Sequence, residues 1–145
     1  MQRGEIAASA MAELEKALRE LPPYDFKANT KHYFAHGTYV RELFIPAGVI
    51  ITGKIHKNSC INIIATGKIR LIADEGLGEV SEPVEISGYA TVVTERGVKK
   101  AVLALEDTIF LNVLPWAGEE DPERAEAMLT YDSYDAMERD TCLLV

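Results

Sequence analysis

The chain has 145 residues, of which 48% are hydrophobic and 26% are charged, and its formal net charge is −8. This length suits one domain with a full hydrophobic core, and no apolar run reaches the ~18 residues that a membrane helix needs. With 15 basic residues against 23 acidic ones, binding to a phosphate backbone is disfavoured, so we expect neither nucleic acid nor a membrane as partner. Two cysteines, Cys60 and Cys142, are too few for a disulfide framework and favour a reducing compartment.

Residues 1–23 are predicted to be an N-terminal helical arm. Apolar residues recur there at spacings of three and four, which places them on one face of a helix: Ile6, Ala10, Met11, Leu14, Ala17, Leu18 and Leu21. Pro22 and Pro23 end the helix, because proline lacks the backbone N–H. The apolar face packs either on the chain's own core or on a partner, and Met11, Leu14 and Leu18 are its candidate contacts.

Residues 24–115 have the texture of an all-β domain. The predicted strands are Lys31–Phe34, Thr38–Ile45, Val49–His56, Cys60–Ala65, Lys68–Ala73, Val80–Ile86, Ala90–Thr94, Val98–Ala104 and Thr108–Leu114. Short strands at near-regular spacing, separated by turn residues, predict an antiparallel sandwich or barrel. Pro83 restricts its strand to a sheet edge, because proline cannot donate to a strand ladder.

Residues 116–145 are predicted to be a short helical tail. Residues 121–123, Asp-Pro-Glu, are a typical helix start, with an Asp cap, Pro at the first position and an acid in the first turn. We expect this helix to run to about Leu129.

The tail also holds apolar candidates for contacts. Trp116 is either a plug in the core or an interface anchor. Leu143 and Leu144 lie in an apolar tip that we expect to cover a sheet edge or to enter a groove on another subunit.

His56 is the candidate functional residue of the central hairpin, residues 46–67. Strand alternation brings His56, Cys60 and Asn62 toward the mouth of the barrel. A histidine–cysteine pair suits a soft or borderline metal, but a stable site needs about four ligands, or three with a water. His56 and Cys60 are therefore weak metal candidates, and we expect no metal, no other cofactor and no catalytic residue.

Two runs carry a family resemblance: HYFAHGTYVRELFIPAGVIITGKIH at residues 32–56 and GVKKAVLALEDTIFLNVLP at residues 97–115. Through them the chain resembles the small cupin-like proteins encoded in tailed-bacteriophage genomes. The resemblance implies a cupin-type jelly roll, with two antiparallel sheets packed face to face.

The same resemblance implies a degenerate metal site. Metal-binding cupins carry a pair of histidines and an acid in a first motif, and another histidine in a second. Only His56 matches. The resemblance places Cys60, Leu105 and Val113 where the phage relatives have histidines, and Asn62 where the general motif has its acid, which implies lost ligands and an apolar pocket.

The predicted function is therefore that of a structural protein without enzymatic activity, most concretely a phage capsid cement or decoration protein. It would bind the major capsid protein, form a homodimer and stabilise the shell on the virion exterior after assembly in the host cytoplasm. Two alternatives remain open: a cupin-type enzyme with His56 as a base beside Lys54 or a tyrosine, and a module that binds a sugar or another small ligand.

Overall fold

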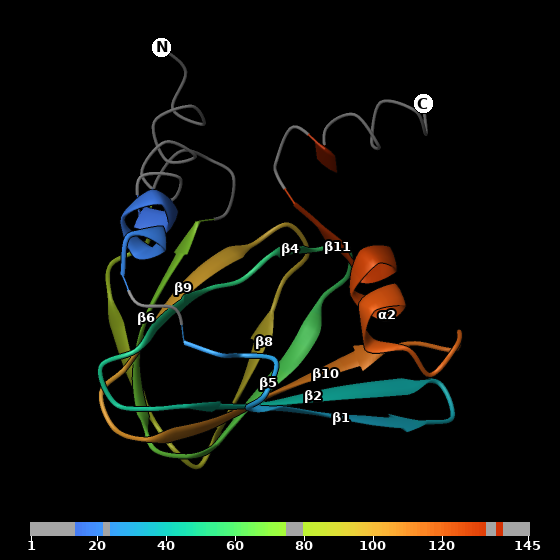
Figure 1. Cartoon of the computed structure of the whole chain (residues 1–145), viewed down its shortest axis with the longest axis horizontal. Helices are drawn as coiled ribbons and strands as arrows, with labels where there is room; N and C mark the ends of the chain where they lie inside the picture. Colours follow the sequence, from blue (N-terminus) through green and yellow to red (C-terminus); the bar gives the residue numbers. More distant parts are fainter. Residues whose placement is uncertain (1–13, 22–23, 75–79, 133–135, 138–145) are drawn as a thin grey trace.

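Antiparallel strands dominate the computed structural model, which describes residues 14–21, 24–74, 80–132 and 136–137 (Figure 1). One sheet has the strand order β1-β2-β10-β5-β8, and a second has the order β3-β9-β6-β7. The strands are β1 Thr30–Ala35, β2 Thr38–Ile45, β3 Ile50–Thr52, β4 Ile55–His56, β5 Cys60–Thr66, β6 Lys68–Asp74, β7 Val84–Ser87, β8 Ala90–Thr94, β9 Lys99–Ala104, β10 Thr108–Pro115 and β11 Thr130–Tyr131. Side chains from both sheets share one core, so the fold is the expected cupin-like jelly roll.

Two of the strand predictions differ from the structure. The strand predicted at Val49–His56 is divided into β3 and β4, with Gly53 and Lys54 between them. Glycine weakens a strand interior, and here the chain leaves the second sheet so that β4 pairs with β11 instead. The strand predicted at Val80–Ile86 begins only after Pro83, as β7, which does lie at a sheet edge.

The inward-facing side chains of β2, β10 and β5 form three layers along the strands. From the mouth inward, β2 contributes Tyr39, Arg41 and Leu43, β10 contributes Leu114, Asn112 and Phe110, and β5 contributes Cys60, Asn62 and Ile64. The first and third layers are apolar clusters, whereas the middle layer is polar. Strand register sets this layering, because Arg41 pairs with Asn112 and Asn112 pairs with Asn62.

Helix α2, Pro122–Leu129, covers the mouth beside the ends of β2 and β10 (Figure 1). The predicted cap is confirmed, because the side chain of Asp121 accepts a hydrogen bond from the backbone N–H of Glu123 at 3.1 Å. Ala125 and Leu129 bury themselves in the apolar cluster nearest the mouth. A helical stretch also covers residues 14–19. In the part of the chain that the structure describes, no helix has both the length and the apolar character to cross a membrane.

Candidate functional site

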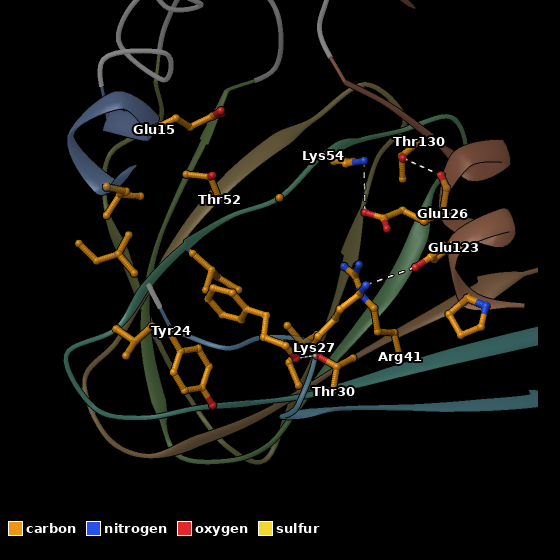
Figure 2. A pocket seen from close by; sticks show the side chains of 18 of the residues that line it. Glu15, Tyr24, Lys27, Thr30, Arg41, Thr52, Lys54, Glu123, Glu126 and Thr130 are labelled. Carbon is orange, nitrogen blue, oxygen red and sulfur yellow. Dashed lines mark hydrogen bonds and ion pairs between the residues drawn. The ribbon is translucent and has the colours of Figure 1, made fainter. Parts of the chain in front are cut away.

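An open cavity of about 1240 Å³ lies at the mouth of the barrel (Figure 2). Strands β1 and β2 form one wall, the segment from β3 to β4 forms another, and α2 closes a third side. Polar side chains that line the cavity include His32, Tyr39, Arg41, Lys54, His56 and Glu126.

Arg41 projects from β2 into this cavity (Figure 2). Its Nη2 donates to Oδ1 of Asn112 at 3.0 Å, whereas its Nε is buried without a hydrogen-bond partner. Among the described residues, no carboxylate forms an ion pair with Arg41. A partly buried guanidinium without a counter-charge is costly, so Arg41 is the group on which an anionic ligand would be stabilised.

The acidic residues that line the cavity already have other roles. Glu123 pairs with Lys27 at 3.4 Å, and Glu126 pairs with Lys54 at 3.4 Å (Figure 2). Glu15 pairs with Lys99, and Asp121 caps α2. These contacts hold the cavity walls together. They leave the positive charge of Arg41 uncompensated within the described chain.

A hydrogen-bonded row runs across the barrel from Arg41. Asn112 Nδ2 donates to Asn62 Oδ1 at 2.5 Å, and Asn62 Nδ2 donates to Thr94 Oγ1 at 2.5 Å. From the opposite sheet, Lys100 Nζ donates to the same Thr94 oxygen at 2.8 Å. Burial, with a contribution from the charge of Arg41, lowers the pKa of Lys100 to about 8. The row thus fixes two cations in the barrel and orients both amides between them.

His56 is a neutral group at the edge of this polar layer. It is 5% exposed, and its Nδ1 is buried without a hydrogen-bond partner. Burial lowers its pKa to about 4, and the positive charges of Lys100 and Arg41 act in the same direction. At pH 7 the imidazole is therefore uncharged and can accept a hydrogen bond from a ligand, whereas a pKa this low disfavours its protonation.

His32 and Tyr39 form a pair beside Arg41. The hydroxyl of Tyr39 lies 2.6 Å from Nδ1 of His32, and the Tyr39 ring stacks on Phe34 with centroids 4.7 Å apart. Burial raises the pKa of Tyr39 and lowers the pKa of His32. Both side chains line the cavity, so the pair can share a proton beside Arg41.

The metal candidates gain no further ligands among the described residues. Cys60 is buried, its Sγ lies 3.9 Å from Oδ1 of Asn62, and burial raises the pKa of its thiol. Nowhere in residues 14–21, 24–74, 80–132 and 136–137 do three or more His, Cys, Asp or Glu side chains gather as a metal site would require.

Two of the positions that the resemblance assigns to lost ligands, Leu105 and Val113, do not line the cavity. Val113 faces outward on β10, where it pairs with Val40 and Ile61, and Leu105 follows the end of β9. Successive strand residues point to opposite faces, so the residue of β10 that reaches the interior at this level is Asn112. The middle of the barrel is consequently polar.

The candidate interface residues are placed only in part. Leu14 and Leu18 are half-buried, and Leu18 lines the cavity. Trp116 packs against the apolar cluster at the mouth, while its Nε1 donates to the backbone oxygen of Glu119 at 2.7 Å. Met11, Leu143 and Leu144 lie outside the described residues. A role of these side chains in binding a partner stays a prediction.

Sequence reasoning missed the roles of Arg41, Thr94 and Lys100. A signal for two of them was present, because Arg41 shares its strand face with the buried Leu43, and Lys100 shares its face with the buried Val102. A charged residue in phase with buried apolar ones points into the barrel. Thr94 carried no such signal, since threonine is ordinary in a strand.

Comparisons with known proteins bear on the fold. No protein-family model matches the chain, and no curated protein matches it. Among solved structures, KdgF from a Halomonas species matches with a TM-score of 0.50 and 14% identity, over 71% of this chain and 94% of that one. A cupin-2 domain protein from Shewanella frigidimarina matches with a TM-score of 0.49 and 8% identity, over 71% of this chain and 92% of that one. At these identities the likeness concerns the fold alone.

The prediction that the chain is not an enzyme is wrong. KdgF, a cupin enzyme, is among the structures with this fold. A jelly roll that matches few cupin ligands therefore gives no ground for excluding catalysis. Nothing in the comparisons bears on a phage origin, a capsid partner, a homodimer or a virion location, which stay predictions.

Proposed function

We propose that the protein binds a small anionic molecule, one that bears a carboxylate or a phosphate, in the cavity at the barrel mouth. The cavity also presents groups for proton transfer to that molecule. In this proposal the working part is the barrel interior, and the described terminal segments serve as its walls.

One observation carries the proposal: the cavity contains Arg41 without a carboxylate partner among the described residues, in a chain whose net charge is −8. Acidic side chains are abundant, yet those lining the cavity pair elsewhere. A guanidinium binds planar anions through parallel hydrogen bonds, and Arg41 lines the cavity with donors beyond the one that it gives to Asn112.

The surrounding groups support chemistry as well as binding. The His56 imidazole is an uncharged hydrogen-bond acceptor at pH 7, and the Tyr39–His32 pair offers a proton donor within the cavity. This arrangement suits a reaction that moves a proton on the bound anion. A cupin-type enzyme and a binding module share this site, and the experiment below separates them.

The test uses small carboxylates and phosphates, each matched with a neutral counterpart, for instance glucuronate with glucose. We expect anionic members to raise the melting temperature and to bind in calorimetry, and their neutral counterparts to do neither. Replacing Arg41→Gln should weaken binding about 30-fold or more, because truncating one partner of a buried charge pair costs about 2–5 kcal/mol. Proton NMR of the bound compound in D₂O shows whether one of its protons exchanges, as an enzyme of this class requires.

The matched control is Arg70→Gln. Arg70 is an exposed arginine of β6 that pairs with Glu85 at 2.8 Å, away from the cavity. This variant should bind the same compounds as the unmodified chain. Equal losses in Arg41→Gln and Arg70→Gln, or binding of neutral compounds only, would contradict the proposal.

A further inference from the structure

The outer face of the five-stranded sheet is almost free of charge. All five strands of this sheet lie within the described residues, and on its outer face only Lys31 and Glu42 are charged. These two side chains pair with each other at 3.9 Å. An antiparallel sheet with one solvated side normally presents polar residues there, so this face departs from the rule.

An apolar row crosses the whole face. Strand register aligns one residue from each strand, in the order Tyr33, Val40, Val113, Ile61 and Val93. Tyr33 is 49% exposed, Ile61 is 43% exposed and Val93 is 59% exposed, so no described segment covers the row. A contiguous exposed apolar patch of this kind marks an interaction site.

We propose that a second copy of this chain packs on the row, sheet against sheet. Charge favours this occupant, because the protein is acidic overall but this face is neutral, so two copies meet here without like charges opposing one another. The face is also self-complementary in size. With a two-fold axis along the central strand β10, the bulky Tyr33 at one edge lies over the small Val93 at the other edge of the second copy.

The available area agrees with a dimer. Five strands at ~4.8 Å spacing, with outward residues over ~20 Å of strand length, give a flat footprint of roughly 400 Å² per copy before side-chain relief is counted. A standard interface buries ~800 Å² per partner, and weak, transient interfaces are smaller. The face therefore has the size of a small interface, which fits a dissociable dimer.

The test is the mass of the full chain in solution at micromolar concentration, by sedimentation velocity. We expect the unmodified chain to have twice the monomer mass, and Ile61→Glu and Val93→Glu each to return it to the monomer mass. Each introduced carboxylate would face the second copy without a partner, which is costly in an apolar interface. Circular dichroism and thermal melting show whether each variant is folded.

A matched control is Val84→Glu. Val84 is an exposed valine, 51% accessible, on β7 of the other sheet. This variant should keep the doubled mass. A monomeric unmodified chain, a dimer that survives Ile61→Glu, or equal dissociation by Val84→Glu would each overturn the proposal. A monomer that Ile61→Glu merely destabilises would show that the chain covers its own face, and would overturn it too. The result is independent of anion binding.

Discussion

The interior of the barrel changes from apolar to polar over two residues along each of three strands. Leu43, Phe110 and Ile64 form an apolar layer, and the residues two positions away on the same strands, Arg41, Asn112 and Asn62, form a polar one. Both layers lie on the same three neighbouring strands. They differ chiefly in their side chains, so the two layers show what each kind of interior contributes.

The apolar layer contributes stability in a non-directional way, about 25 cal/mol for each Å² of apolar surface removed from water. The polar layer contributes little net stability, because its hydrogen bonds replace bonds to water. The polar layer instead fixes the positions of charged groups. The hydrogen-bonded row from Arg41 to Lys100 holds two cations inside the barrel, and Arg41 lines the cavity where a ligand can reach it. We infer that folding depends chiefly on the apolar layer and that function depends chiefly on the polar layer.

The largest expected effect is in the apolar layer. Ile69 of β6 is fully buried in the same apolar cluster, and Ile69→Ala should lower the free energy of unfolding by about 2–5 kcal/mol, because lost transfer energy and a cavity both contribute. Urea denaturation measures the change. Val84→Ala, on the exposed face of β7, should stay within about 0.5 kcal/mol of the unmodified chain. Similar losses in both variants would remove the distinction between the layers.

Much of the apolar layer could be predicted from sequence, because its cues are local. Turn residues and alternating apolar residues predicted β2 and β8 with the bounds that the structure has. The sequence Asp-Pro-Glu at residues 121–123 likewise predicted the start of α2. These signals involve neighbours in the chain and need no knowledge of how strands pair.

The polar layer depends on contacts between distant residues. Arg41 meets Asn112 because β2 pairs with β10, and Lys100 meets Thr94 because the two sheets pack together. Assigning the lost ligand to Val113 rather than to the neighbouring Asn112 shows how sensitive this is, since a shift of one residue moves a side chain to the other face. Local pattern cannot determine that register.

The next largest effect is on the pH dependence of the polar layer. The pKa of His56 in the folded chain is about 4, below the ordinary 6.5, so between these values the unfolded chain binds a proton that the folded chain does not. The contribution of neutral His56 to the free energy of unfolding is therefore fully present above about pH 6.5. It is lost as the pH drops, and the loss is on the order of 3 kcal/mol at pH 4. The free energy of unfolding of the unmodified chain and of His56→Gln, measured from pH 7 to pH 4.5, checks this. We expect the variant to lose less stability on acidification, and parallel curves would contradict the assignment.

The smallest expected effect on stability comes from substitutions in the two layers on one strand, β5. Asn62→Leu changes little in volume but leaves the Asn112 amide without its acceptor and Thr94 without one donor, so it should cost about 1–3 kcal/mol. Ile64→Leu, two residues further along β5, should cost less than about 1.5 kcal/mol, because apolar packing tolerates a swap of equal volume.

The double variant Asn62→Leu/Asn112→Leu decides what the amides do. If they only satisfied each other, replacing both would restore stability, since a pair of partners can be exchanged for apolar groups at little cost. We expect no recovery, because Arg41 Nη2 then loses its acceptor at 3.0 Å and a charged group is left unpaired inside the barrel. Urea denaturation of the two single variants and the double variant completes the cycle. Recovery in the double variant would make the polar layer a replaceable part of the core, whereas continued loss ties both amides to holding the cation of the cavity.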